Sequence, residues 1–293
     1  MVQAQERFGR VVQVGLHRRS SALYEHLHDL IAQGKIGEVT VARAYRVSNM
    51  APHGIGRYPD APPPAGLDWE MWLGPRAFRP FRYNIAPYKF RWWQEYSSQM
   101  GNWGVHYCDA IRWMLDETAP VAVSAQGGRF AVDDDRTIPD TLDVTFEFAS
   151  GRVLHFGQYE ACESKPISGG EIEFCGTLGS LYPGAEAHGG KVVPSKKGQF
   201  QENPATVEAE EIAPRDGDLT HQHIRNFLDC VRSRKKCHCD LEVGHRSTSF
   251  AHLANLALAT RTRLEWDAAQ ERFTNSQRAN ELLDYEYRAP WKL

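Results

Sequence analysis

The spacing of apolar residues near the start of the chain predicts a helix over residues 21–33. Leu23, Leu27 and Leu30 recur at the intervals that place side chains on one helix face. Gly34 follows in the position where glycine commonly ends a helix. The same kind of pattern predicts further helices over residues 103–116, 219–233 and 242–263.

Alternating apolar and polar residues predict a strand over residues 36–49 and a longer β-rich region after Pro120. Ser150-Gly151 has the composition of a hairpin turn. The strands expected in this region cover residues 121–129, 141–148, 152–160, 170–175, 179–182, 190–194 and 206–212. Strands in succession, with helices before and after them, predict the α+β class: an open, mainly antiparallel β-sheet with helices on one face.

The first twenty residues do not fit this sheet. Residues 2–9 are predicted to be the end of a helix, and Val11-Val12-Gln13-Val14-Gly15 a short buried strand. An apolar strand of this kind is usually buried between other strands and helices, and the sequence before it supplies no strand for it to pair with. We therefore interpret residues 1–20 as the remnant of the end of another domain, and residues 21–293 as the sheet domain.

Two segments between the predicted elements have unusual compositions. Residues 50–68 are rich in proline and glycine and are predicted to form a long loop, which is usually functional or an insertion. Residues 69–98 are dense in aromatic side chains, among them Trp92. Two interpretations remain open: these side chains stack on sugar rings, or they form a satellite hydrophobic cluster under the loop.

Composition excludes several classes of protein. The net charge of −3 gives no basic excess to hold a phosphate backbone, so we expect no nucleic-acid partner. No apolar run reaches the length of a membrane helix, so we expect no membrane association. The N-terminal residues lack the apolar core of a secretory signal, which predicts a cytoplasmic protein.

The cysteines do not predict a metal site. Six cysteines in a chain of this length are not a disulfide scaffold. Cys230, Cys237, His238 and Cys239 lie close together in the sequence, but the second ligand pair that a zinc site requires is missing. We interpret this cluster as a turn after a helix.

Several motifs, in their order along the chain, resemble one protein family. The chain is similar to the Gfo/Idh/MocA oxidoreductases, the family of glucose-fructose oxidoreductase and inositol dehydrogenase, and the resemblance covers essentially its whole length. The segments that carry it are VVQVGLHRRS at 11–20, GKIGEV at 34–39, WEMWLGP at 69–75, GNWGVHYCD at 101–109 and NFLDCVRSRK at 226–235.

The resemblance implies the C-terminal sheet domain of such an enzyme, preceded by the last helix and strand of a truncated Rossmann domain. The glycine-rich fingerprint that binds a dinucleotide pyrophosphate does not occur in the sequence. The lysine of the family's Glu-Lys-Pro motif is also missing. Three explanations remain open: the true start lies upstream, the gene is truncated, or the chain acts without a cofactor domain of its own.

The family's chemistry is hydride transfer between a sugar or polyol carbon and NAD or NADP. Oxidising an alcohol needs a base for the hydroxyl proton, and a histidine suits that role because its ordinary pKa lies near neutrality. His106 occupies the position of the family's catalytic histidine. Asn102 stands one helical turn earlier, where an aspartate is commonest. An asparagine still hydrogen-bonds a sugar hydroxyl but supplies no charge to an imidazolium.

The resemblance also suggests residues for substrate and cofactor. Arg18 and Arg19, at the hinge after the first strand, are expected near the nicotinamide, and Arg18 near the substrate as well. Asp109 either orients His106 or the substrate, or is an exposed helical acid. The remaining expected sugar contacts are Tyr45, Arg46 and Asn49 at the end of the first sheet strand, and Trp92.

The function predicted from these residues is the substrate-binding, histidine-bearing portion of a sugar- or polyol-type NAD(P)-dependent oxidoreductase. It is expected to be inactive without the nucleotide-binding half. The alternative is a non-catalytic carbohydrate-binding or oligomer-forming domain. In either case the resemblance implies a homodimer or homotetramer assembled through the open sheet.

Overall fold

The computed structural model describes residues 1–163, 166–167, 170–184, 188–202 and 205–292. A ten-stranded sheet forms the body of this structure, in the order β10-β9-β2-β3-β4-β1-β5-β6-β7-β8. Its strands are β1 (Val39–Val47), β2 (Ala122–Gly128), β3 (Thr141–Glu147), β4 (Val153–Tyr159), β5 (Ile172–Gly176), β6 (Gly179–Pro183), β7 (Gly190–Pro194), β8 (Glu210–Ile212), β9 (Leu264–Asp267) and β10 (Arg272–Phe273).

The sheet is open and mainly antiparallel, as the sequence predicted. Every neighbouring pair of strands is antiparallel except β1 and β4, which run parallel. The first strand in the chain therefore lies in the middle of the sheet, between β4 and β5. The carboxyl ends of β1 and β4 consequently meet at the same edge of the sheet.

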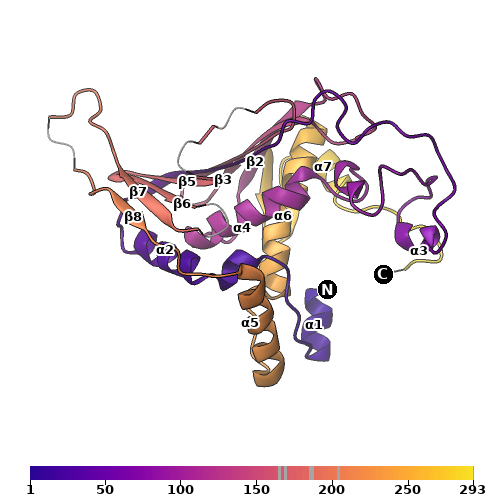
Figure 1. The fold of residues 1–293 in the computed structure, drawn as a ribbon, viewed down its shortest axis with the longest axis horizontal. Helices are drawn as coiled ribbons and strands as arrows, with labels where there is room; N and C mark the ends of the chain where they lie inside the picture. Colours follow the sequence, from indigo (N-terminus) through magenta and orange to yellow (C-terminus); the bar gives the residue numbers. More distant parts are fainter. Residues whose placement is uncertain (164–165, 168–169, 185–187, 203–204, 293) are drawn as a thin grey trace.

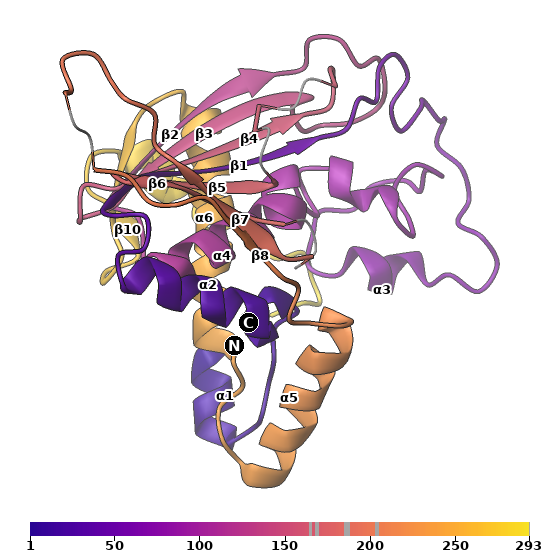
Figure 2. The same ribbon diagram turned by 60° about the vertical axis from the view of Figure 1, so that its left-hand side comes forward.

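The helices are α1 (Val2–Phe8), α2 (Ala22–Ala32), α3 (Trp69–Leu73), α4 (Val105–Met114), α5 (Leu219–Ser233), α6 (Leu241–Thr260) and α7 (Gln277–Glu281). Figure 1 shows α2, α4 and α6 on one face of the sheet. In Figure 2, α1 and α5 project together from the end of the molecule below α2. Short helical turns are η1 (His17–Ser20), η2 (Lys89–Trp92) and the π-helical turn η3 (Met100–Gly104).

The four helices predicted from apolar spacing are confirmed, and capping side chains fix where several begin. Ser21 accepts a hydrogen bond from the backbone N–H of Tyr24 at the start of α2. Asp218 and Asp240 cap α5 and α6 in the same way. The predicted helix at 103–116 corresponds to α4, whose N-terminus continues from the π-helical turn.

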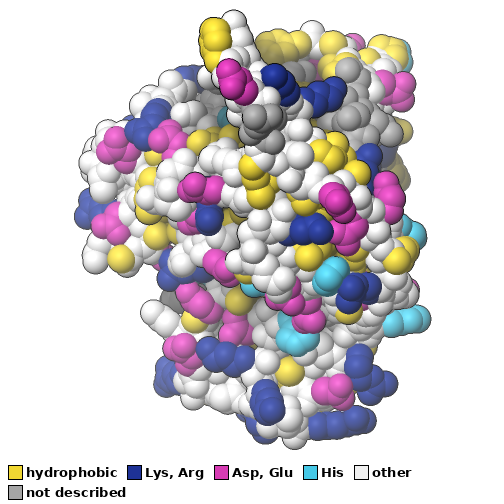
Figure 3. Space-filling view, turned by 90° about the vertical axis from the view of Figure 1, so that its left-hand side faces the viewer, with side chains coloured by type: hydrophobic (Ala, Val, Ile, Leu, Met, Phe, Trp, Pro, Cys, Tyr) yellow, Lys and Arg dark blue, Asp and Glu magenta, His cyan; other side chains and the backbone are white. Residues whose placement is uncertain are grey.

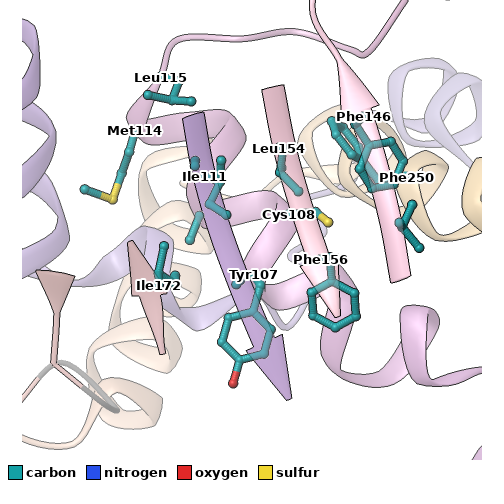
Figure 4. Packing of buried hydrophobic residues seen from close by; sticks show 14 of the residues in the cluster. Tyr107, Cys108, Ile111, Met114, Leu115, Phe146, Leu154, Phe156, Ile172 and Phe250 are labelled. Carbon is teal, nitrogen blue, oxygen red and sulfur yellow. The ribbon is translucent and has the colours of Figure 1, made fainter. Parts of the chain in front are cut away.

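The main hydrophobic core lies between the sheet and α4. Small residues on β1, Ala42 and Ala44, are fully buried and let the helix approach the sheet closely. Figure 4 shows Cys108 and Ile111 of α4 among the apolar side chains of the neighbouring strands. Burying a side chain of the size of isoleucine stabilises the fold by about 1.5–3 kcal/mol, so this layer fixes the position of α4.

The strand predicted at 11–15 is wrong. These residues form an irregular segment, in which the N–H of Val14 donates to the carbonyl of Cys239 at 2.8 Å. Leu16 is buried against Val105 and Cys239. An apolar run becomes a strand only beside a neighbour that pairs with its backbone, and among the described residues this segment has one such contact to the loop before α6. The helix predicted before it is confirmed as α1.

The aromatic segment forms a second hydrophobic cluster under the long loop. Trp69, Phe81, Ile85 and Trp93 are buried there together with Ile55 of the loop. Of the two interpretations left open by the sequence, the satellite cluster therefore describes most of this segment. The C-terminal residues cover one end of it, since Arg288 donates to the carbonyls of Gly74 and Arg76.

A buried ion network ties the loop to the sheet. Arg136 is fully buried, and its guanidinium donates to both carboxylate oxygens of Asp134 at 2.9–3.0 Å and to Glu160 at 2.6 Å. Asp134 also accepts from the N–H of Ile55 in the loop. Glu160 accepts from the indole N–H of Trp92 at 3.0 Å. One set of charged hydrogen bonds thus holds the loop and the aromatic segment to the residue that follows β4.

No helix in the described part of the chain is long and apolar enough to span a membrane. Lysine and arginine side chains gather at the lower end of the view in Figure 3.

Candidate functional site

The π-helical turn and the first turns of α4 carry the candidate catalytic residues. Ser98 accepts from the N–H of Gly101 within the turn and from the amide of Asn255 on α6, both at 3.0 Å. The turn is therefore anchored to a second helix before His106 is reached. Its widened geometry, which is common at functional sites, brings Asn102, Trp103 and His106 to one end of the sheet.

His106 lies partly buried beside the hinge turn η1. Its ring centroid is 5.6 Å from that of His17, with the two planes tilted by 55°. Burial, followed by the charge of Arg18 and by His17, lowers the pKa of His106 to about 4. The imidazole is therefore neutral at physiological pH and has a nitrogen that can accept a proton.

Arg18 lies at the same place, with 7% of its surface exposed. Its Nε donates to the hydroxyl of Tyr24 at 3.1 Å, and its Nη2 donates to Glu171 at 3.3 Å. The guanidinium carbon lies 5.1 Å from the ring centroid of Tyr107. Arg18 thus lies between the hinge, the first turn of α4 and the start of β5.

Asp109 and Arg19 pair with each other. The Nε of Arg19 donates to both carboxylate oxygens of Asp109 at 2.9 and 3.0 Å. Asp109 is 1% exposed and also accepts from the hydroxyl of Ser247 on α6. Both side chains therefore connect the hinge to α4 and α6, and Asp109 is a buried acid rather than an exposed one.

The structure separates the remaining sequence candidates. Tyr45 lies on the open face of the sheet against Tyr159, at a ring distance of 5.9 Å, because alternate residues of β1 face opposite sides. Asn49 accepts from the N–H of Ala51 in an exposed turn. Trp92 donates to Glu160 in the buried ion network. Asn102 accepts from the Nε of Arg91 at 3.1 Å.

Several residues near His106 were not singled out from the sequence. Trp103, Tyr107, Gln158 and Glu171 surround the same end of the sheet as Arg18 and Arg46. Arg46 itself was expected from the sequence, and strand alternation explains its direction. Arg46 is two residues from the buried Ala44, so strand alternation points a charged side chain towards the helices.

His223 and the cysteine cluster have local contacts. His223 hydrogen-bonds the hydroxyl of Ser20 and the carbonyl of Val14, which fixes the hinge to α5. Cys230 and Cys237 are buried, and burial followed by Cys230 raises the pKa of Cys237 to about 12. No group of three or more His, Cys, Asp or Glu side chains in the described ranges is arranged to hold a metal ion.

The sequence of residues 39–293 matches the profile of the oxidoreductase family's C-terminal alpha/beta domain. The chain belongs to the Gfo/Idh/MocA oxidoreductase family. The resemblance of the sequence motifs is thereby confirmed. A comparison with curated proteins finds no match.

Solved structures show the same fold. Aldose-aldose oxidoreductase from Caulobacter crescentus, complexed with glycerol, superposes with a TM-score of 0.61 at 12% identity over 90% of this chain. WlbA dehydrogenase from Bordetella pertussis, in complex with NADH and UDP-GlcNAcA, gives a TM-score of 0.56 at 15% identity over 91%. Gal80p from Saccharomyces cerevisiae, as a super-repressor mutant, gives 0.61 at 12% identity over 90%.

The matched region spans 66% of the oxidoreductase from Caulobacter crescentus and of WlbA, and 67% of Gal80p. This chain therefore corresponds to about two thirds of each of these proteins. The α+β class with an open, mainly antiparallel sheet is common to them and to this chain.

Proposed function

We propose that this chain is the substrate-binding, histidine-bearing portion of a sugar- or polyol-type NAD(P)-dependent oxidoreductase. The observation that carries the proposal is the place of His106 on the first turn of α4, beside His17 and near Arg18 at the hinge, in a chain whose residues 39–293 match the family's C-terminal domain. A general base must be free of its proton, and burial, followed by Arg18 and His17, keeps His106 unprotonated at neutral pH.

The chemistry assigned to this chain's own residues is proton transfer and positioning. His106 accepts the proton of the sugar hydroxyl as hydride leaves the same carbon. Asn102, one turn earlier on the same helical end, donates its amide to that hydroxyl; its Oδ1 is already occupied by Arg91. Burial and then Arg18 keep His106 neutral, and the charge of Arg18 stabilises the oxygen as negative charge develops on it.

The described residues do not fit the dinucleotide as a whole. Its phosphates need a glycine-rich turn between a strand and a helix, and residues 11–20 form an irregular segment that leads into η1. Arg19, a candidate cofactor contact, is engaged by Asp109. We propose that residues 1–20 are the end of a nucleotide-binding domain and that the rest of it is supplied upstream or by another chain.

The proposed function is tested by restoring that half. A fusion of residues 1–293 to the nucleotide-binding domain of a solved family member should reduce NAD or NADP in the presence of a sugar or polyol. The absorbance of the reduced nicotinamide measures the rate. The same domain without residues 1–293 is the control, and equal rates from the two would contradict the proposal.

Residues 1–293 alone are expected to bind NAD(H) or NADP(H) weakly, because the phosphate-binding turn is not among them. Calorimetry should give a dissociation constant above about 10 μM, equivalent to binding weaker than about −7 kcal/mol. A tighter constant would show that these residues hold the dinucleotide themselves and would overturn the division at residue 20.

The open face of the sheet is expected to mediate a homodimer or homotetramer. It carries tyrosine rings and polar pairs, the exposed pair of Tyr159 with Asp143 and the partly buried pair of Tyr182 with Glu173. Light scattering at micromolar concentration should give about two or four times the chain mass of 33.2 kDa. As a control, Asp143→Arg reverses a charge on that face, removes the acceptor of the Tyr159 hydroxyl and should shift the assembly towards a monomer; a monomer for the unchanged chain would refute the expectation.

The second candidate is a non-catalytic carbohydrate-binding or oligomer-forming domain. One observation favours it: Asn102 stands where a carboxylate would hold an imidazolium, and its side-chain oxygen is occupied by Arg91. A chain that binds sugars but gives no turnover in the fusion would support this candidate.

A further inference from the structure

Buried polar atoms without partners gather at the carboxyl ends of β1 and β4. Gln158 is 1% exposed, yet neither its Nε2 nor its Oε1 has a hydrogen-bond partner in the described structure. Arg46 lies directly opposite it in the parallel register, and its buried Nε is also unpartnered. Burying such groups unpaired is costly to the fold, and two of them at one place point to a ligand that completes their hydrogen bonds.

The hydroxyl of Tyr107 belongs to the same cluster. It makes no hydrogen bond of good geometry, although the carboxylate of Glu171 lies within its reach, and it points away from the apolar side chains labelled in Figure 4. Burial and then Glu171 raise the pKa of Tyr107, whereas Arg18 and Arg46 lower it. The hydroxyl therefore lies within the electrostatic reach of both arginines and stays protonated, as a hydrogen-bond donor.

Arg46 differs from Arg18 in having no carboxylate partner in the described part of the chain. Arg18 pairs with Glu171, and on the open face of the sheet Arg43 pairs with Glu173. Within the described ranges no acidic side chain lies in ion-pair distance of Arg46. Its guanidinium instead stacks on Trp103, at 4.0 Å from the ring centroid. Stacking covers the flat face of the guanidinium and leaves its edge, which carries the N–H donors, open to a planar anion.

The charge at this site is therefore positive once the internal pairs are counted. Glu171 offsets Arg18, and the charge of Arg46 has no counterpart. A partly buried cation without a partner favours a ligand that brings the opposite charge. Trp103 lies three residues before His106, so the stacked guanidinium and the neutral imidazole lie on neighbouring positions of one helical surface.

We propose that the substrate carries a carboxylate, as in a uronic or aldonic acid, and that Arg46 binds it together with Gln158 and Tyr107. The inference rests on the proposed function and specifies its substrate class. The guanidinium edge and the Nε2 of Gln158 donate to the carboxylate oxygens, while the Oε1 of Gln158 accepts from a neighbouring sugar hydroxyl. The carboxylate end is thereby held apart from the carbon whose hydroxyl faces His106.

The test is calorimetric titration of the full chain with D-glucuronate and D-galacturonate, each against its neutral counterpart, D-glucose or D-galactose. A charge-assisted hydrogen bond predicts about ten- to hundredfold tighter binding of the acid. Arg46→Gln should abolish this preference, so that the acid and the neutral sugar bind with similar affinities. Arg43→Gln, on the same strand but the opposite face, is the matched control and should preserve the preference.

Arg46→Lys provides a second variant that keeps the charge but loses the planar fork, and an intermediate preference is expected from it. Equal affinities for acid and neutral sugar, or a preference that survives Arg46→Gln, would overturn the proposal. Binding of inorganic phosphate or acetate as tight as that of the uronates would also overturn it, since the site would then select anions in general. The proposal would likewise be overturned if neither uronate bound at millimolar concentration.

These outcomes are independent of hydride transfer. A restored enzyme that oxidises glucose and glucuronate equally well keeps the proposed function and refutes the carboxylate assignment. Conversely, a carboxylate preference in binding, without turnover in the fusion, keeps the assignment and refutes the oxidoreductase function.

Discussion

Replacing Arg136 by methionine is expected to lower the free energy of unfolding by about 3–5 kcal/mol. The side chain is fully buried, and it neutralises both Asp134 and Glu160. Methionine fills a similar volume but leaves two carboxylates buried without a cation, and that uncompensated charge produces the loss. Urea unfolding followed by circular dichroism measures the change, as a lower midpoint at a similar slope.

Arg57→Met is the matched control for this prediction. Arg57 pairs with Asp133, next to Asp134 in the sequence, but both side chains are more than half exposed. Exposed pairs contribute little because water and salt screen them, so the unfolding midpoint should stay where it is. Equal effects of the two substitutions would mean that the buried network does not hold the loop to the sheet.

The network also predicts a dependence on acid. Burial raises the pKa of Glu160, which Arg136 partly offsets. A raised folded-state pKa means that Glu160 takes up a proton more readily in the folded protein than in the unfolded one. The ionised form of Glu160 therefore opposes folding at neutral pH. This penalty becomes smaller as the pH falls towards the ordinary pKa of the group. Arg136→Met should enlarge that trend, because it removes the main group that keeps Glu160 ionised.

Most of the fold was predictable because its elements follow simple periodicities. The alternation around Val144 and Phe146 gives β3 its buried face, and the spacing of Leu23 and Leu27 gives α2 a buried face. The sequence did not reveal β9 and β10, since strands of four and two residues are too short to display a period. The strand expected at 11–15 failed for a different reason: its apolar residues are strand-like, but pairing depends on neighbours that the described residues lack.

The candidate site was only partly predictable. His106 and Arg18 were named from motifs, and the structure brings them together. Asp109 and Arg19 were also named, but they pair with each other. A motif records which residues recur and carries no information on which face of a strand they occupy. Tyr45 and Arg46 are neighbours in the sequence, yet only Arg46 faces the helices. Gln158 comes from a strand more than a hundred residues later and had no local signal.

His106→Ala in the restored enzyme is expected to lower kcat by about 10²–10⁴-fold. Alanine removes the group that accepts the hydroxyl proton and leaves the surrounding residues in place. In the part of the chain that the structure describes, the partly buried imidazole makes no hydrogen bond to the protein, so the melting temperature should change little. Rates and melting temperature are measured on the same preparation. Asp109→Asn is a useful contrast, because the loss of the partner of Arg19 should lower stability.

The acid limb of kcat/KM gives an independent check on the role of His106. This profile reports the pKa of the free enzyme's base, and the pKa of His106 is lowered to about 4. Activity should therefore persist below the ordinary histidine pKa of 6.5 and fall only near pH 4. Asn102→Asp places a carboxylate one turn away, which raises the pKa of the imidazole. The acid limb of that variant should move to higher pH.

The lowered pKa of His106 also predicts how the free energy of unfolding depends on pH. Because its folded-state pKa lies below the unfolded value, the unfolded chain binds more protons between pH 6.5 and about 4. Stability contributed by the neutral form is fully present above pH 6.5 and is lost as the pH falls through this window. His106→Ala removes that part of the slope, whereas a histidine that titrates normally would leave the slope unchanged. A variant that keeps kcat and also keeps the wild-type slope would show that His106 neither transfers the proton nor lies in the environment that keeps it neutral.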